Sequence, residues 1–398
     1  MTPNALARQL FARYDRFKVD HLSPETCRHE TIVRELDGLV RRSRGLLTMG
    51  ELGTSLGGRS IHLIRCGAGS RRVLLWSQMH GDECTATLAL CDLLTCLVET
   101  GRERSWVAQM LEQTEIAIIP MLNPDGADGV TRHNATHIDI NRDARALITA
   151  EGRILRETHR ALRPSFAFNL HDQSLSSVGA TRKVAVMALL APAADEERRR
   201  PLSRVKAMRV CALIARSLQQ FANGHLSTYD DAYEGRAFGD RMQSWGTSTI
   251  LIESGHWPGD PLKEFPRKLN FVALLVALHG IGDGTYQDVE LEHYSRLQPN
   301  GKQVYDLIVR NIRLLHPSGW SSRADVALSL EPEANRRSRA PVAVIKEIGD
   351  LSTHAGLETI DASARQVRHE ALAIEKQIPL QELLDMLQLY RSRPIASS

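Results

Sequence analysis

Short apolar runs alternate with longer helical patterns through the first 290 residues. Four runs, at residues 71–80, 115–126, 165–172 and 248–255, are rich in aliphatic residues and each ends at polar or turn-forming residues. Continuous apolar runs of this length, separated by helical stretches, are typical of strands in a sheet covered on both faces. We therefore predict an α/β fold with a mostly parallel sheet, and we expect ligands at the carboxyl ends of its strands.

The pattern divides the chain into three parts. Residues 1–45 alternate short helical patterns with charged residues and are interpreted as a helical entry region. Residues 46–295 hold the apolar runs and form the predicted main α/β domain, with Gly57 and Gly58 marking a hairpin turn near its start. Residues 296–398 are interpreted as a small accessory domain of β character.

The accessory segment is expected to combine helices and short strands. The stretch at 300–317 has a helical pattern, and 381–392 is predicted to form the last helix. Between them, 324–332 and 341–361 have the alternation and turn residues of strands. The pattern of this segment therefore differs from that of residues 46–295.

Composition narrows the class of protein. Apolar residues make up 42% and charged residues 24%, which is typical of folded domains. The net charge of +3 is too small to indicate a nucleic-acid or membrane partner, and the longest apolar stretches fall short of a bilayer span of roughly 20 residues. The first 20 residues lack the apolar core of a secretory signal, so we expect a cytoplasmic location. The six cysteines lack metal-binding spacing and are interpreted as buried thiols.

The sharpest chemical signal is His80-Gly81-Asp82-Glu83, which follows a predicted buried strand and precedes a helix. A histidine and a glutamate three residues apart can bind one cation, but a catalytic zinc needs a third protein ligand. His171 ends another apolar run and is the natural candidate. A surface His–Glu pair is the ordinary alternative, and the position of both histidines at strand ends makes it less favourable.

These residues belong to a longer series of motifs. The motifs and their order along the chain resemble those of the zinc carboxypeptidases of the carboxypeptidase A-like superfamily. The matching residues are His80 and Glu83, Asn123-Pro124-Asp125-Gly126, Arg132, Asp139-Ile140-Asn141-Arg142, His171 and Glu253.

The resemblance implies a three-layer α/β/α fold with a mixed, mostly parallel central sheet, and a single zinc ion held by His80, Glu83 and His171. It further implies that Glu253 is the general base, taking a proton from water and passing it to the leaving amine. Arg132 matches the arginine that polarises the scissile carbonyl.

Asn141 and Arg142 match the pair that binds the terminal carboxylate of the substrate. A guanidinium suits this role because it offers a carboxylate two parallel hydrogen bonds and stays charged. The Asn123–Gly126 segment is instead interpreted as a turn, since all four residues favour turns, and it is left out of the site.

Other positions stay open at this stage. The capping tyrosine of the family could correspond to Tyr229 or Tyr233. Both Asp240 and Arg241 lie in the expected specificity region, so a basic or an acidic side chain could be preferred. Asp172 is interpreted first as a strand-end cap and second as a residue that orients a ligand.

We therefore predict a zinc metallocarboxypeptidase, a hydrolase that removes a C-terminal residue from a peptide. The first alternative is a zinc-dependent deacylase or amidase acting on N-acyl amino acids or cell-wall peptides. The second is a zinc-binding or peptide-binding module without turnover, which the presence of Glu253 disfavours. The expected partner is a peptide or acyl amino acid with a free carboxylate, and the oligomeric state is unknown.

Overall fold

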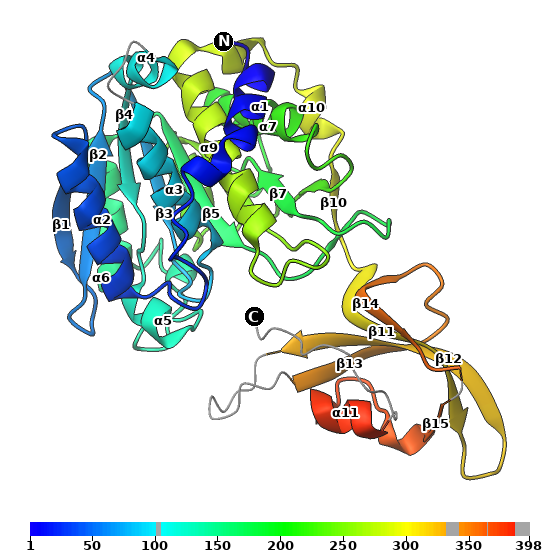
Figure 1. Ribbon diagram of the computed structural model, residues 1–398. Coiled ribbons are helices and arrows are strands. Elements are labelled where there is room, and N and C mark those ends of the chain that lie inside the picture. Colours follow the sequence, from blue (N-terminus) through cyan, green and yellow to red (C-terminus); the bar gives the residue numbers. More distant parts are fainter. Residues whose placement is uncertain (101–104, 332–341, 364, 387–398) are drawn as a thin grey trace. The chain divides into compact units, whose positions relative to one another are not determined.

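The structure is a computed structural model that describes residues 1–100, 105–331, 342–363 and 365–386 (Figure 1). The chain divides into two compact units. The first comprises Met1–Gln173, Val186–Ser254 and Glu264–Pro299, and the second comprises Ser174–Ala185, Gly255–Lys263 and the chain from Asn300 onward.

The strands of the first unit are short. They are β1 (Thr48–Thr54), β2 (Ser60–Cys66), β3 (Arg71–Ser77), β4 (Thr114–Ile119), β5 (Phe166–Asp172), β7 (Met187–Leu190), β8 (Leu226–Thr228) and β9 (Ser248–Ser254). Its helices are α1 (Pro3–Ala12), η1 (Tyr14–Arg16), α2 (His29–Ser43), α3 (Thr85–Thr100), α4 (Trp106–Gln113), α5 (Pro124–Gly129), η2 (Ile140–Arg142), α6 (Ala150–Leu162), α7 (Leu202–Leu218), α8 (Phe238–Ser244), α9 (Glu264–Asp283), η3 (Thr285–Asp288) and α10 (Glu292–Ser295).

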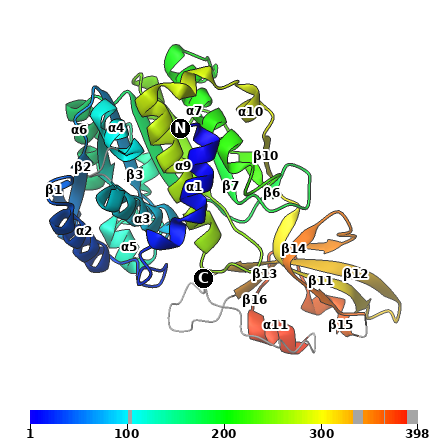
Figure 2. The ribbon, with the colours of Figure 1, turned by 45° about the horizontal axis from the view of Figure 1, so that its top comes forward.

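The strands form one mixed sheet in the order β1-β2-β4-β3-β5-β9-β7-β8. Strands β4, β3, β5 and β9 run parallel in its centre, and β1 and β2 pair antiparallel with their neighbours. Strand β7 pairs antiparallel with β9 and parallel with β8. Helices α3, α7 and α9 cover one face (Figures 1 and 2). Helices α6 and α8 pack on the other. The predicted three-layer fold is therefore confirmed, and the hairpin expected at Gly57 and Gly58 joins β1 to β2.

A buried ion pair attaches the N-terminal segment to this unit. Arg267 and Asp92 are 1% and 0% exposed, and two guanidinium nitrogens donate to the carboxylate at 2.7 Å. The Tyr14 hydroxyl donates to the same carboxylate at 2.8 Å. Arg267 also donates to the carbonyl oxygens of Val19 and Leu22 at 3.1 and 2.8 Å. Because every charge here has partners, the pair is compatible with complete burial.

Residues that the structure describes include no helix with the length and hydropathy needed to cross a bilayer.

The second unit is a small β structure with its own core. Its strands are β6 (Ser177–Val178), β11 (Val304–Leu315), β12 (Ser321–Glu331), β13 (Val342–Gly349), β14 (Ala355–Asp361), β15 (Gln366–Arg368) and β16 (Gln377–Pro379). Its helices are η4 (His369–Ala371) and α11 (Leu380–Met386). Strand β10 (Gln298–Gly301) lies where the chain passes from the first unit to the second. The main sheet has the order β14-β11-β12-β13-β16, with β15 also paired to β11. Aliphatic side chains from these strands and from α11 form the core.

The helix predicted at 300–317 is wrong, because this stretch forms β11 and part of β10. Leu307 and Val309 point into the core, and the next core residue is Ile312 rather than residue 311. A bulge lies between Val309 and Ile312, with Asn311 at a φ of 59°. The extra residue breaks the strict alternation, so apolar residues recur at a spacing that imitates a helix.

The other elements predicted for this segment are found in the structure. The strands predicted at 324–332 and 341–361 correspond to β12, β13 and β14. The last predicted helix corresponds to α11 up to residue 386, and the rest of it lies outside the described residues.

Candidate active site

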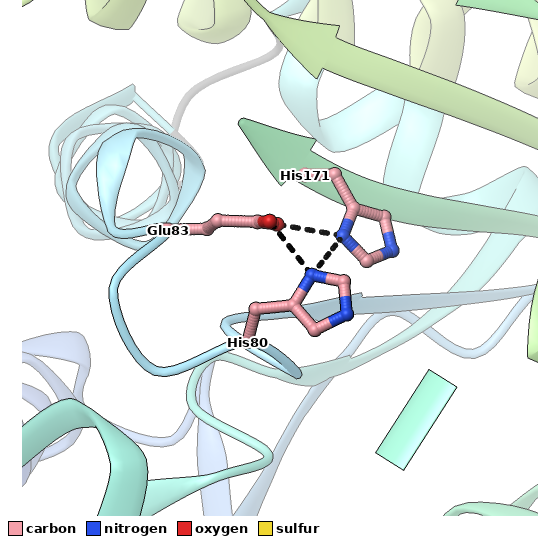
Figure 3. Close-up of side chains that lie close together, drawn as sticks. All are labelled: His80, Glu83 and His171. Atoms are coloured by element: carbon pink, nitrogen blue, oxygen red, sulfur yellow. Dashed lines mark hydrogen bonds and ion pairs between the residues drawn. The ribbon is translucent and has the colours of Figure 1, made fainter. Parts of the chain in front are cut away.

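Three predicted metal ligands converge in the structure (Figure 3). His80 and Glu83 lie in the loop between β3 and α3, and His171 lies near the end of β5. The Nδ1 atoms of His80 and His171 lie 2.7 Å from Oε1 and Oε2 of Glu83, respectively. The two Nδ1 atoms are 3.2 Å apart.

This arrangement fits a zinc ion. Zinc in proteins takes nitrogen and oxygen ligands at about 2.0–2.2 Å, and tetrahedral geometry then places the ligand atoms roughly 3.3 Å apart. Both histidines are only 2% exposed, so the donors are buried and held in place. Burial alone would raise the pKa of Glu83, but His171 and His80 outweigh it and hold that pKa well below its usual range. The glutamate is therefore ionised, as a zinc ligand must be.

The backbone of the ligand loop is tightly constrained. Gln78 adopts a left-handed conformation with a φ of 51°, and its side-chain amide donates to the Gly81 carbonyl at 2.8 Å. A Cβ atom on Gly81 would lie 1.9 Å from the backbone of Gly126, so only glycine fits there. The loop that carries His80 is thus held by close backbone packing.

The Asn123–Gly126 segment supplies that packing. It forms the N-cap and first turn of α5, where the Asn123 side chain accepts from the Gly126 N–H at 2.9 Å. The Asn123 amide also donates to the carbonyls of Met79 and Arg132 at 3.3 and 3.4 Å. The segment therefore supports the site from behind.

Asp139 is a residue that sequence reasoning left out of the site. Its Oδ1 lies 3.2 Å from His80 Nε2, the ring nitrogen that faces away from the other ligands. Its Oδ2 accepts from Nε and Nη2 of Arg132 at 3.2 and 3.0 Å. Burial raises the pKa of Asp139, but the contacts with His80 and Arg132 outweigh it and lower that pKa below its usual range. Its position in the Asp139–Arg142 motif is the sequence feature that could have identified it as a site residue.

Arg132 lies directly beside the ligands. Its Nη1 is 3.2 Å from His80 Nδ1 and 3.4 Å from Glu83 Oε1. The side chain is 40% exposed, so the guanidinium can also be reached from solvent. Asp139 holds the other edge of the group and so fixes where its positive charge lies.

Glu253 stands next to His171 across the parallel pair of β5 and β9. The two residues are in register, so their side chains leave the sheet on the same side. Glu253 is 8% exposed. The pKa of Tyr229 is raised, first by burial and then by the charges of Glu253 and Glu83. Tyr229 is therefore within electrostatic reach of Glu253 and Glu83.

Asn141 and Arg142 follow Asp139 in η2. The side-chain oxygen of Asn141 accepts from the Phe238 N–H at 3.0 Å, which leaves its amino group as the donor. Arg142 is 41% exposed and lies 3.8 Å from Glu234. Its charge also acts on Tyr229.

The structure gives Asp172, Asp240 and Arg241 different surroundings. The Asp172 carboxylate accepts from the Thr85 hydroxyl at 2.6 Å and so ties the end of β5 to α3. Asp240 accepts from the Glu234 N–H at 3.4 Å, and burial raises its pKa to about 7. Arg241 instead lies beside Trp245, with its guanidinium carbon 5.8 Å from the ring.

Comparisons with known proteins agree with the fold and the motifs. Residues 32–169 match the family model described as zinc carboxypeptidase. Carboxypeptidase 2 of Trichophyton rubrum is 30% identical over 105 residues, covering 26% of this chain and 19% of that protein. The carboxypeptidase N catalytic chain of Homo sapiens is 28% identical over 145 residues, covering 31% of this chain and 32% of that protein. The chain thus spans about a fifth to a third of the length of these relatives.

Solved structures support the same fold. A metallo-carboxypeptidase from Burkholderia cenocepacia has a TM-score of 0.52 at 17% identity, with 64% of this chain and 69% of that one covered. Thrombin-activatable fibrinolysis inhibitor has a TM-score of 0.50 at 12% identity, with 71% and 81% covered. The first unit therefore has a zinc carboxypeptidase fold. The resemblance to the zinc carboxypeptidase family indicated by the motifs is confirmed.

Proposed function

We propose that the protein is a zinc-dependent metallocarboxypeptidase that hydrolyses the C-terminal peptide bond of a peptide. The observation that carries this proposal is the convergence of two imidazoles and a carboxylate beside Arg132, with Glu253 in register with His171. Peptide hydrolysis needs these groups together: a metal site, a positive charge for the developing oxyanion, and a base.

A zinc ion held by His80, Glu83 and His171, one per chain, supplies Lewis acidity for cleavage of the amide. Glu253 takes a proton from the attacking water and delivers it to the leaving nitrogen, which departs as an amine. Its place beside His171 puts this base on the side of the sheet where the ligands lie.

The other charged residues bind the substrate. Arg132 donates hydrogen bonds to the scissile carbonyl oxygen, and Asp139 keeps its guanidinium in place. The amino group of Asn141 and the guanidinium of Arg142 bind the terminal carboxylate. Both are donors, as a carboxylate requires, and the exposure of Arg142 leaves it accessible to an incoming chain end.

The test is product analysis by mass spectrometry with zinc-loaded protein. The panel contains free-acid peptides with varied last residues, the same peptides amidated at the C-terminus, and N-acyl amino acids. We expect single residues to be lost from the free-acid peptides only, because amidation removes the carboxylate that Asn141 and Arg142 bind. Activity should disappear after metal removal and return with zinc.

Two results would contradict the proposal. Cleavage of acyl amino acids without cleavage of any peptide would assign the site to a deacylase. Equal cleavage of free-acid and amidated peptides would show that the terminal carboxylate is not recognised.

A further inference from the structure

A cavity of about 550 Å³ lies where β5 and β9 begin, at the opposite edge of the sheet from His171 and Glu253. Thr247 precedes Glu253 by six positions along β9 and its approach, which corresponds to roughly 20 Å of strand. The volume falls in the range of small-molecule binding sites. The lining includes Arg156, His159, Arg160 and Arg163 from the end of α6, with Trp245 and Thr247 from the segment before β9.

Positive charge at this cavity is not neutralised by the protein. Arg156, Arg160 and Arg163 line it, and Arg241 lies beside its Trp245 wall. In the described part of the chain, none of these four guanidinium groups has a carboxylate within ion-pair distance. The pKa of Arg156 is lowered by burial and by the charges of Arg160 and Arg241, as expected where like charges gather.

A hydrogen-bond chain fixes one of the arginines in place. Arg156 Nη1 donates to His159 Nδ1 at 3.3 Å, so the ring proton is on Nε2, which donates to the Thr247 hydroxyl at 2.8 Å. That hydroxyl donates to the Pro164 carbonyl at 3.1 Å. The Arg156 guanidinium also lies 3.6 Å from the centre of the Trp245 ring. Arg156 is therefore preorganised before any ligand arrives.

A second arginine has an unused donor. The Nε of Arg241 is buried and has no hydrogen-bond partner among the described residues. An unpaired buried N–H is costly, and it leaves Arg241 as a further cation beside the Trp245 wall with no described group paired to its Nε. The C-terminal end of α6 attracts cations by its dipole. That effect does not account for Arg241, which comes from α8.

We propose that this cavity binds a small anion carrying two or more phosphate groups. Guanidinium groups pair with phosphate oxygens through two parallel hydrogen bonds, and several of them in one cavity exceed what a single carboxylate would need. The anion could be free polyphosphate or the phosphate chain of a nucleotide, because the arginines recognise the chemistry that both share.

The experiment is isothermal titration calorimetry of the full chain with tripolyphosphate, ATP and inorganic phosphate, each at low and moderate salt. Zinc content is measured before and after titration, so that metal removal by phosphate is distinguished from binding. We expect one saturable site for tripolyphosphate or ATP and much weaker binding of inorganic phosphate. Equal affinity for tripolyphosphate and ATP would identify the phosphate chain alone as the ligand, whereas tighter ATP binding would identify a nucleotide.

The variant for this test is Arg160→Gln combined with Arg163→Gln. Both side chains are exposed at the cavity, so their replacement should leave the fold intact. Affinity should fall at least tenfold, since hydrogen bonds to charged groups are strong. The matched control is Arg34→Gln with Arg41→Gln, two exposed arginines of α2. Absence of binding to tripolyphosphate and ATP, or an equal loss in the control, would overturn the proposal.

Discussion

Strands β5 and β9 present two very different environments at their two ends. At the carboxyl edge, where His171 and Glu253 lie, Arg132 is bound by Asp139 and the Glu83 carboxylate contacts two histidines. At the amino edge, the arginines around Trp245 have no acidic partners within the described residues.

The two ends of β5 and β9 thus differ in how their charged side chains are paired. At the carboxyl edge, opposite charges hold one another in place, so each donor has a defined position relative to a reacting atom. At the amino edge, charges of one sign accumulate, and a bound counterion would relieve their repulsion. The first arrangement favours chemistry and the second favours binding.

The largest expected effect is at the carboxyl edge, where the Glu253 carboxylate is proposed to act as the base. Glu253→Gln should lower kcat by about 10²–10⁴-fold, because general base catalysis contributes that much. Zinc content should stay unchanged, since Glu253 is not a ligand. The measurements are steady-state kinetics and metal analysis. Glu157→Gln, an exposed carboxylate on α6, is the control, and a comparable loss of kcat there would contradict the assignment.

At the amino edge, His159 should make stability depend on pH. Burial and then Arg156 lower its pKa from 6.5 to about 4, so the folded state resists protonation more than the unfolded chain. Its contribution is present above pH 6.5 and is lost as the pH falls toward 4, amounting to about 3 kcal/mol at 1.36 kcal/mol per unit.

Urea unfolding between pH 7 and pH 4 measures this effect. His159→Gln should flatten the profile over that window, whereas the control His21→Gln, at a 64% exposed side chain, should leave it unchanged. Identical profiles for the wild type and His159→Gln would show that this histidine does not set the pH dependence.

A smaller effect is expected from Asp139, which positions His80 and Arg132 without being a metal ligand. Asp139→Asn should weaken zinc binding by about 10–100-fold, the usual effect of losing a partner behind a ligand. Competition with a zinc chelator measures this. Asp128→Asn, which removes a carboxylate paired with Arg59, is the control and should retain wild-type affinity.

The smallest expected effect tests whether the amino edge acts independently of the carboxyl edge. Arg160→Gln combined with Arg163→Gln should leave kcat and KM within about twofold of the wild type when no phosphate is present, because surface changes far from a site perturb it little. Steady-state kinetics in a phosphate-free buffer checks this. A large fall in kcat would show that these arginines support the catalytic edge.

Much of the carboxyl edge could be predicted from the sequence. His80, Glu83 and His171 stand at the ends of apolar runs, and parallel strands bring such ends together, so local pattern was enough to predict their proximity. Asp139 was visible only as part of a motif. Its role depends on reaching His80 from 59 residues away, which no local pattern encodes.

The amino edge and the accessory segment were less predictable. Arg156 and Trp245 lie on different elements, and their contact depends on how α6 and α8 pack on the sheet. In β11, one extra residue near Asn311 changed the apparent period and produced a false helix. The contact between Arg156 and Trp245 and the strand at β11 could therefore not be predicted from the apolar pattern alone.

The buried pair of Asp92 and Arg267 has a consequence for protein synthesis. Arg267 binds the carbonyls of Val19 and Leu22, which precede it by 248 and 245 residues. At about 5–20 residues per second, the ribosome needs roughly 12–50 s to add those residues. The segment around Val19 and Leu22 is thus made well before the arginine that binds it, and until then these two carbonyls lack their native partner.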